Sequence, residues 1–344
     1  MAVSLREVAD AAGVSIATAS RALGGKGRVS GVTVDRVKAT AERLGYRVDP
    51  FGKALRKGSD NVVGMVVPFV SNPFYAALVQ EFEDRLDQVG LQLLIADSRG
   101  EIDREVERLE TLAGRRVRGV FVAPAYASWS RATIASVAGR VPLVQVDRRV
   151  DDGGDLSFVG VDNAGGIRQV LEHLAAQGAQ HVVFVGADDR TSAGRERARA
   201  FTAVAAELDL VVQPPVIDRY LFEFGVRAAD QLVARTELPD AIVAGDDLIA
   251  AGLLAGLHRH GVAVPDEVLL AGFDGTVLAD ICTPTLTTVV QPIADVAATA
   301  VDLMLRQIDG DTTARQVELP TTLRTGRSTS TDRVSARNGH RSAQ

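Results

Sequence analysis

A repeated alternation of short apolar runs and helical segments, from residue 61 onward, limits the possible folds more than any other feature. Runs rich in Val, Ile and Leu predict strands at 62–67, 92–96, 119–123, 142–146, 157–161, 182–186, 241–244 and 268–273. Predicted helices begin near residues 74, 101, 129, 164, 194, 224 and 247. Continuous apolar strands separated by helices indicate parallel sheets covered on both faces. So many units favour two doubly wound α/β lobes, with the chain crossing between them near Val161, Pro292 and its end.

Polar side chains recur where these predicted strands end. Ligands of doubly wound folds bind outside the carboxyl ends of the strands. The residues at those ends include Asn72, Phe74, Asp147, Asp246 and Asp274. A strand-end carboxylate can equally cap the helix that follows, so each of them is open to both interpretations.

A second pattern precedes the alternation. Ser4–Leu23 predicts two short helices joined at Gly13, with Ser15 as the N-cap of the second helix, Ile16–Leu23. This arrangement is typical of a helix-turn-helix, whose second helix can lie in a DNA major groove. An ordinary helical hairpin that caps a larger domain is the alternative. Thr33–Leu44 predicts a third amphipathic helix, which completes a small bundle.

The charge is distributed unevenly along the chain. Residues 1–58 hold 11 Lys/Arg and 5 Asp/Glu, a balance of +6, whereas the remainder carries −12 and the whole chain −6. A basic head on an acidic body is expected of a module that contacts nucleic-acid phosphates. The single Cys282 excludes an internal disulfide and a thiolate metal cluster, and fits a reducing cytoplasm. The apolar runs are too short to span a bilayer, and charged residues interrupt any signal peptide at the N-terminus.

Motifs of several enzyme classes are missing from the sequence. There is no G-x-G-x-x-G for a dinucleotide, no G-x-x-x-x-G-K-[ST] for a nucleotide phosphate and no G-x-S-x-G for a nucleophile. His181, His258 and His260 lack the companions of a metal site. We therefore predict no catalytic residue, metal or cofactor. The rival classes are an enzyme and a periplasmic binding protein, but the latter would need a signal peptide and would not carry a basic head.

The head and body together resemble the LacI family of transcription regulators. The head carries VADAAGVSIATASRAL, then Val29-Ser30, then LGY at 44–46. The body carries SNPFY at 71–75, VGVDN ending at 163, GRERARAF at 194–201, GDDLIAAG at 245–252, LAGFD at 270–274 and LTTVVQP at 286–292. The match covers roughly residues 3–328 in the order of the family. It implies a body similar to periplasmic sugar-binding proteins, with two lobes and a cleft between them.

The resemblance divides the chain into four parts. They are a DNA-binding head (1–48), a hinge helix or linker (49–60), an effector-binding and dimerisation domain (61–328) and a disordered tail (329–344). Leu55 of the hinge matches a leucine that wedges into the minor groove, although it could instead pack on the body. The tail has no leucine heptad, so the resemblance implies a homodimer, joined through the exposed faces of helices at 74–89 and 101–113.

The inserted helix supplies the predicted contacts to a near-palindromic, double-stranded operator. Base contacts are predicted for Ile16, Ala17 and Arg21, and phosphate or sugar contacts for Ser15, Thr18 and Ser20. Arg21 can pair with guanine, whereas Ile16 and Ala17 can contact thymine methyl groups.

The resemblance also implies the effector contacts. Arg195 matches the family arginine that reaches the effector; the alternative is a helix-surface arginine like Arg197 or Arg199. Asp246 and Asp274 match carboxylates that accept hydrogen bonds from ligand hydroxyls. Further contacts are predicted for Asn72, Asp147 and two aromatics, Phe74 and Tyr220, which could instead be core residues. The chain is thus predicted to be a cytoplasmic repressor that responds to a sugar or a related polyhydroxy metabolite.

Overall fold

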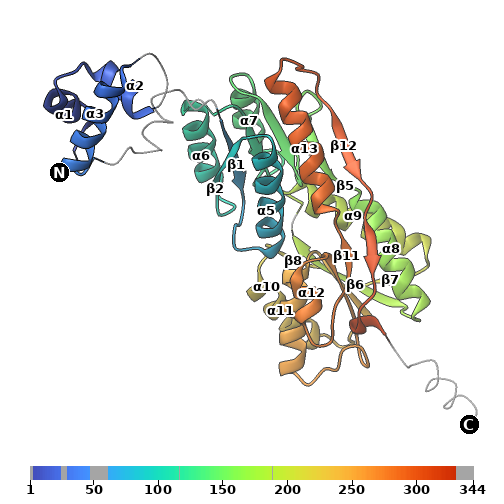
Figure 1. Cartoon of the computed structure of the whole chain (residues 1–344). Coiled ribbons are helices and arrows are strands. Elements are labelled where there is room, and N and C mark those ends of the chain that lie inside the picture. Colours follow the sequence, from blue (N-terminus) through green and yellow to red (C-terminus); the bar gives the residue numbers. More distant parts are fainter. Residues whose placement is uncertain (1–2, 25–28, 47–60, 116, 188, 331–344) are drawn as a thin grey trace, which may run out of the picture. The chain divides into compact units, whose positions relative to one another are not determined.

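The computed structural model describes residues 3–24, 29–46, 61–115, 117–187 and 189–330 of the 344-residue chain. The chain divides into two compact units, Met1–Asp60 and Asn61–Gln344, and each is described here by itself. Figure 1 labels their helices and strands. Within the described ranges, no helix has the length and apolar character needed to cross a membrane.

The described residues of the first unit form three short helices, α1 (Leu5–Ala12), α2 (Ile16–Gly24) and α3 (Gly31–Arg43). A capping box begins α1: the Ser4 hydroxyl accepts from the backbone N–H of Glu7, whose carboxylate accepts from the backbone N–H of Ser4. Gly13 ends α1 with a φ of 63°, a left-handed conformation that glycine adopts without steric cost. The chain thereby turns sharply into α2, as the sequence predicts.

Serine hydroxyls begin the other two helices. Ser15 Oγ accepts from the backbone N–H of Thr18 at 3.2 Å, and Ser30 Oγ accepts from that of Thr33 at 3.4 Å. The cap at Ser30 makes α3 begin two residues before the predicted start at Thr33. The core of the bundle consists of small apolar side chains, namely Val8, Ala9, Ala12, Ala19, Ala22, Val37 and Ala41.

The second unit has two α/β lobes, and the first lobe is built on a parallel sheet of six strands. Their order is β12-β5-β4-β3-β1-β2. The strands are β1 (Val62–Val67), β2 (Gln92–Asp97), β3 (Val120–Val122), β4 (Leu143–Val146), β5 (Ser157–Val161) and β12 (Gln316–Leu319). Helices α5 (Pro73–Gln88) and α13 (Ile293–Ile308) cover one face, and α6 (Ile102–Gly114) and α7 (Arg131–Ala138) cover the other.

The second lobe repeats this plan. Its sheet has the order β13-β11-β10-β9-β6-β7, with β8 also paired to β6. The strands are β6 (His181–Ala187), β7 (Val211–Val212), β8 (Val216–Asp218), β9 (Ala241–Ala244), β10 (Leu269–Asp274), β11 (Thr287–Val290) and β13 (Thr322–Arg324), which is antiparallel to β11. Helices α8 (Asn163–Ala176) and α9 (Ser192–Glu207) cover one face, and α10 (Phe222–Val233) and α11 (Asp247–Arg259) the other, with α12 (Val277–Ile281) beside α11.

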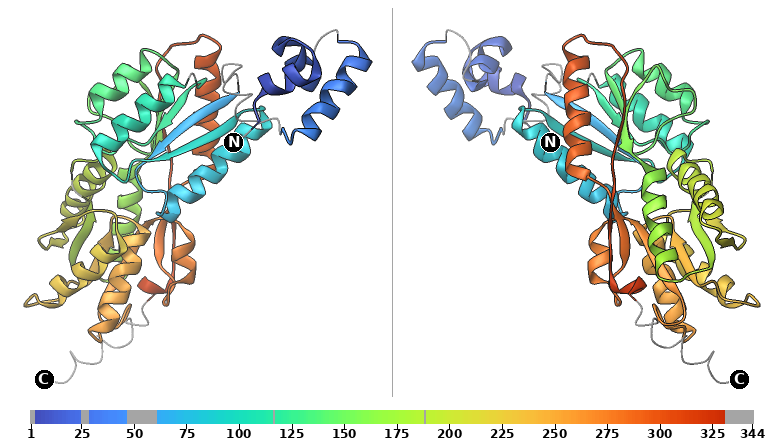
Figure 2. Two further views of the ribbon diagram at one scale, coloured as in Figure 1. Left: turned by 90° about the vertical axis from the view of Figure 1, so that its left-hand side faces the viewer. Right: turned by 90° about the vertical axis from the view of Figure 1, so that its right-hand side faces the viewer.

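Three segments connect the lobes. The chain passes from β5 to α8, returns from β11 to α13, and passes again from β12 to β13. Figure 2 shows from two sides that α13 lies in the lobe of α5 although it follows β11 of the other lobe. The predicted architecture of two doubly wound lobes, with crossings near Val161, Pro292 and the chain's end, is therefore confirmed.

The ordered chain continues further than expected at its C-terminal side. Arg327–Thr329 form a 3-10 turn in which Ser328 and Thr329 are buried. The Ser328 hydroxyl donates to the Leu270 carbonyl, and the Thr329 and Thr287 hydroxyls are 2.6 Å apart. The described structure thus includes residues 329 and 330, where the predicted disordered tail begins. The rest of that tail, 331–344, lies outside the described residues.

Candidate functional site

A small cavity between the two lobes collects polar side chains from the strand ends. Its lining consists of Asn72, Phe74, Tyr75, Asp147, Arg148, Ala193, Arg197, Tyr220, Asp246 and Asp274. Six of the seven predicted effector residues therefore meet at one place, as expected of residues that follow the carboxyl ends of parallel strands. The cavity measures only about 10 Å³, which is close to the space that one water molecule requires.

Asn72 and Asp246 connect the two lobes inside this cavity. The Asn72 side-chain oxygen accepts from the backbone N–H of Phe74 and so caps α5, while its amide nitrogen donates to Asp246 Oδ2 at 3.2 Å. The other oxygen of Asp246 caps α11 by accepting from the backbone N–H of Ile249 at 2.7 Å. For these residues the two interpretations are compatible, because one side chain caps a helix and also lines the cavity.

Arg197, and not Arg195, is the arginine of α9 that reaches the cavity. Arg197 is buried; its Nε donates to Asn163 Oδ1 at 2.8 Å and its Nη1 to the Gly245 carbonyl at 2.6 Å. Nη1 also lies 3.5 Å from Asp274 Oδ1, and the guanidinium carbon is 3.7 Å from the centroid of the Phe273 ring. The sequence-based interpretation of Arg197 as a surface residue is therefore corrected.

Arg195 points to a different part of the lobe interface. It forms an ion pair with Asp151 and is absent from the cavity lining. Residues of an α-helix succeed one another at about 100°, so two residues two positions apart face nearly opposite ways. Arg197, and not the predicted Arg195, is therefore the arginine of α9 that lines the cavity.

A second buried arginine, Arg148, lies between aromatic rings of both lobes. Its guanidinium carbon is 5.9 Å from the centroid of the Tyr75 ring and 5.1 Å from that of Tyr220. Its Nε is 3.5 Å from Asp147 Oδ2, the oxygen to which the Tyr75 hydroxyl donates at 2.6 Å. Burial lowers the pKa of Arg148, but the neighbouring phenols and carboxylates, Asp246 included, outweigh burial and raise it. Arg148 is thus a permanent cation in the cavity.

Among the described residues, two buried polar groups of this cavity make no hydrogen bond, although one of them lies in ion-pair range of Asp147. They are Arg148 Nε and the Tyr220 hydroxyl. Leaving a buried donor without a partner costs about 1–3 kcal/mol. Both groups are available to hydrogen-bond a ligand oxygen, which gives the cavity donors in addition to its carboxylate acceptors.

Burial shifts two acids of the cavity, Asp246 and Asp274, toward their neutral forms. It raises the pKa of Asp246 to about 6, although the backbone N–H of Ile249 and the Arg197 cation oppose the shift. Burial likewise raises the pKa of Asp274 well above its usual value, with Arg197 again opposing. Shifts of this kind gather at functional sites, where charged groups are held away from water.

Backbone strain coincides with two of these acids. Asp147 has a φ of 63° and Asp274 a φ of 107°, conformations that residues with a Cβ rarely adopt. Such strain costs of order 1–3 kcal/mol and persists where the surrounding structure enforces it, commonly at binding sites. Both residues directly end a strand, so the strain directs their carboxylates into the cleft.

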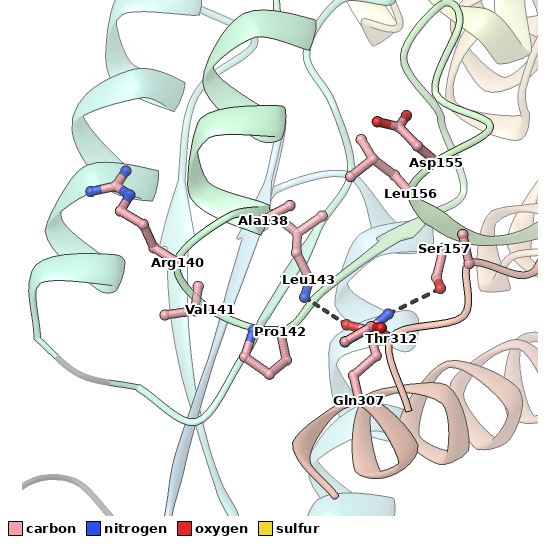
Figure 3. Close-up of a pocket in the computed structure, with 11 residues that line it drawn as sticks. Ala138, Arg140, Val141, Pro142, Leu143, Asp155, Leu156, Ser157, Gln307 and Thr312 are labelled. Carbon is pink, nitrogen blue, oxygen red and sulfur yellow. Dashed lines mark hydrogen bonds between the residues drawn. The ribbon is translucent and has the colours of Figure 1, made fainter. Parts of the chain in front are cut away.

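A larger hollow lies at the opposite edge of the first lobe but has no comparable chemistry. It measures about 310 Å³ and is drawn in Figure 3. Gln307 of α13 already pairs with two polar groups of this hollow, because its oxygen accepts from the backbone N–H of Leu143 and its nitrogen donates to Ser157 Oγ. The interlobe cavity, although smaller, is therefore the better candidate for ligand binding.

The predicted DNA contacts lie on the outer side of α2. Ser15, Ile16, Ala17, Ser20 and Arg21 are exposed, and Thr18 is half-buried. Ile16 is 41% exposed, so its apolar side chain is accessible for contact. Arg21 Nε donates to the Ala17 carbonyl at 3.1 Å. Leu55 and the hinge lie outside the described residues.

The described ranges contain no group of three or more His, Cys, Asp or Glu side chains that could hold a metal ion. The acids of the cavity are instead balanced by arginines, as in Asp147 with Arg148 and Asp274 with Arg197. The arrangement is suited to an organic ligand with several hydroxyl groups, because carboxylates accept hydrogen bonds from hydroxyls and guanidinium groups donate to their oxygens.

Sequence reasoning missed Tyr75, Arg148 and Arg197 as cavity residues. Tyr75 and Arg148 directly follow predicted site residues at strand ends, which was a usable signal. Arg197 had no such signal, since a motif with two arginines does not tell which of them faces inward.

Two family models match the chain. The model of bacterial regulatory proteins of the lacI family matches residues 4–49, and that of a periplasmic binding protein-like domain matches residues 171–329. The first match covers α1, α2 and α3, and the second covers most of the lobe that holds Arg197, Asp246 and Asp274.

Whole-chain relatives agree with these matches. The ribose operon repressor of Halalkalibacterium halodurans is 29% identical over 306 residues, covering 89% of this chain and 90% of that protein. The sucrose operon repressor of Streptococcus mutans is also 29% identical, covering 95% of this chain and 100% of that protein. A lac repressor dimer bound to operator and the anti-inducer ONPF has a TM-score of 0.79 at 22% identity, covering 96% of this chain and 100% of that one. This last similarity establishes a shared fold.

Proposed function

The chain belongs to the LacI family of bacterial regulatory proteins, and on that premise we propose how its two units act. It is a DNA-binding transcriptional regulator with an effector-binding domain. We propose that it is a cytoplasmic repressor whose effector is a sugar or a related polyhydroxy metabolite. The observation that carries the proposal is that carboxylates and arginines of both lobes converge on one cavity, in a chain that begins with a helix-turn-helix.

DNA recognition is assigned to α2. Its exposed Ile16, Ala17 and Arg21 contact base edges in the major groove, where a guanidinium pairs with guanine and apolar groups meet thymine methyls. Ser15, Thr18 and Ser20 contact the phosphate backbone. A near-palindromic operator follows if two heads of a homodimer bind symmetry-related half-sites. The Leu55 wedge remains a prediction of the resemblance.

Effector recognition combines acceptors and donors. Asp147, Asp246 and Asp274 accept from ligand hydroxyls, and Arg148 and Tyr220 donate to ligand oxygens. Arg197 holds Asp274 in place through an ion pair, and Asn72 and Phe74 also line the cavity. The names of the ribose and sucrose operon repressors support a carbohydrate as the ligand class.

The effector acts by changing the position of the two lobes relative to each other. A cavity of about 10 Å³ does not hold a monosaccharide, since ligand pockets usually measure about 300–1,000 Å³. Binding therefore requires the lobes to separate and to close again around the ligand. An effector can shift the DNA-binding state only by its differential affinity for the two lobe arrangements.

A homodimer is supported by exposed apolar side chains. Val277 and Ile281 of α12 and Leu94 and Ile95 of β2 are all exposed. Exposed apolar residues that cluster on one element commonly mark an interface. These elements add to the faces of α5 and α6 that the sequence analysis predicts.

The test is sequence-specific retardation of promoter DNA by the purified full chain, with and without ribose, sucrose and cellobiose. We expect one DNA site to be preferred over random duplex, the complex to respond to a sugar, and the sugar to be recovered unchanged. A chain that binds all duplexes equally at moderate salt, or that converts the sugar, would contradict the proposal. Equilibrium sedimentation of the same sample checks the dimer.

A further inference from the structure

One loop of the first lobe contacts the second lobe beside the cavity through aromatic rings. The loop between β3 and α7 carries Tyr126 and Trp129, whose rings pack edge to face with centroids 4.9 Å apart. Arg190, which follows β6 in the other lobe, places its guanidinium carbon 5.2 Å from the Tyr126 centroid and 5.9 Å from that of Trp129. The guanidinium cation is attracted to the faces of both rings at these distances. Trp129 is 58% exposed, so the contact lies at the solvent-facing rim.

A second contact joins the same loop to the second lobe. Asp151, which follows β4, forms an ion pair with Arg195 of α9. The Ser128 hydroxyl donates to Asp151 Oδ2 at 2.6 Å, and the Asp151 backbone N–H donates to the Ala127 carbonyl at 2.9 Å. The Ser128 hydroxyl and the Arg195 cation lower the pKa of Asp151, so its carboxylate stays charged. The loop and Asp151 are thus one assembly within the first lobe.

A backbone hydrogen bond lies between these two side-chain contacts. The Ala127 N–H donates to the Arg190 carbonyl at 2.7 Å, across the lobe boundary. The second lobe therefore holds the loop at three points, which are its ring faces, its backbone and the carboxylate bound to it. Because the loop carries two of these contacts and is hydrogen-bonded to Asp151, which makes the third, loosening one of them weakens the others.

These residues are separate from the ligand cavity. None of Tyr126, Trp129, Asp151, Arg190 and Arg195 belongs to its lining. The chain crosses between the lobes next to β5 and β12, whereas the loop follows β3, two strands away from β5. Neighbouring strands are about 4.8 Å apart, so a rotation of the lobes about the crossings separates this loop from the second lobe. The contacts can exist only while the lobes are close.

We propose that Tyr126, Trp129, Asp151, Arg190 and Arg195 form an interlobe latch, which holds the cleft closed and opens to admit the effector. The effector's part in this rests on the proposed function, but the latch acts without an effector. Arg195 thus controls the effector response through the lobe equilibrium and not through contact with the ligand.

Trp129 reports on the latch directly, because it is the only tryptophan of the chain. The experiment measures acrylamide quenching of Trp129 fluorescence in the full chain, without DNA or sugar. Arg195→Ala removes the ion pair without touching the indole. We expect its quenching constant to rise about twofold and its emission to shift to the red, because the open population grows. Asp151→Asn should have the same effect.

The matched control is Arg227→Ala, which removes an arginine of the same lobe that pairs with the exposed Asp218. Its quenching should equal that of the wild type. Raising NaCl from about 0.05 to 1 M should increase quenching in the wild type but not in Arg195→Ala, because salt screens the partly exposed ion pair. Circular dichroism confirms that each variant is folded.

Equal quenching in wild type, Arg195→Ala, Asp151→Asn and Arg227→Ala would overturn the latch and leave a simple surface ion pair. This outcome is distinguishable from a failure of the proposed function, which would be seen only in the DNA retardation experiment.

Discussion

The direction of the side chain decides whether an arginine of α9, Arg195 or Arg197, is buried at the cavity or lies at its rim. Arg197 is buried against the Phe273 ring and supports Asp274 at the cavity, whereas Arg195 reaches Asp151 at the rim. Two buried hydrogen bonds of the Arg197 guanidinium, to Asn163 and to the Gly245 carbonyl, also depend on that direction. The two arginines therefore have different energetic roles within one helical turn.

We expect Arg197→Ala to lower the free energy of unfolding of the body by about 3–5 kcal/mol, because it leaves a buried carboxyl group without its cation. Ligand-induced thermal stabilisation should disappear. Arg195→Ala is the matched control and should cost no more than about 1 kcal/mol, as a partly exposed pair does. Urea unfolding followed by circular dichroism measures both. Equal losses in the two variants would refute the assignment of Arg197 to the cavity.

In the head, Arg21 is the arginine on which DNA recognition is predicted to depend. We expect Arg21→Ala to weaken operator binding by about 1–3 kcal/mol, because it removes a bidentate contact to guanine. Arg43→Ala at the end of α3 removes the same charge from an exposed position outside α2. Fluorescence anisotropy with operator and random duplex separates the two effects. An equal loss of operator and random-duplex binding in Arg21→Ala would mean a phosphate contact instead of a base contact.

At the scale of elements, α10 and α11 pack unusually closely through glycines. A Cβ built at Gly252 would lie 2.1 Å from the Phe222 carbonyl oxygen, and one at Gly225 would lie 2.3 Å from that of Ile249. Both neighbours are backbone atoms, which cannot rotate away as a side chain does. The approach of these helices positions the N-terminus of α11, where Asp246 lines the cavity.

Gly252→Ala should therefore destabilise the body by about 1–3 kcal/mol, as overpacking does. Gly114→Ala is the control, because a Cβ at this exposed position of α6 meets nothing within 4 Å. Alanine should there stabilise the helix by up to about 1 kcal/mol. Urea unfolding monitored by Trp129, which lies in the body, measures both variants. If Gly252→Ala left the free energy of unfolding unchanged, the two helices could move apart without loss of stability.

At the scale of the whole molecule, buried acids make stability depend on pH. Burial raises the pKa of Asp247 to about 7, against hydrogen bonds from Thr288 and Thr276 that lower it, and raises that of Asp246 to about 6. In the unfolded chain an aspartate titrates near 3.9. Between about pH 4 and 7 the native state thus binds more protons than the unfolded state, so stability falls as the pH rises.

We expect the free energy of unfolding of the body to decrease by about 1–3 kcal/mol from pH 5 to pH 8, since one pKa unit corresponds to about 1.4 kcal/mol. Acids with lowered pKa values, such as Asp151 and Asp240, are ionised throughout this range and contribute a constant amount. Asp247→Asn should reduce the decrease. Urea midpoints across this pH range provide the measurement, and a midpoint that rises with pH would contradict the sign.

Much of the fold was accessible to sequence reasoning. Eight predicted strands match observed ones to within a residue or two, and the cap at Ser15 lies where the sequence predicts it. The sequence did not predict β7, β8, β11, β12 and β13. Of these, β12 and β13 lie at sheet edges, are half exposed and carry weak apolar patterns. Helix α13 was also missed, although Ile293–Ile308 has a clear amphipathic pattern.

Periodicity, caps and turn glycines are properties of neighbouring residues, so the elements, the two-lobe plan and the helix-turn-helix follow from the chain's own order. Only three-dimensional packing decides that Arg197, and not Arg195, lines the cavity. Packing likewise decides that Arg148 lies between Tyr75 and Tyr220, and that Trp129 contacts Arg190 across the cleft. The reason is that these contacts depend on the rotation of a helix and on the distance between lobes, and both are set by residues far away in the sequence.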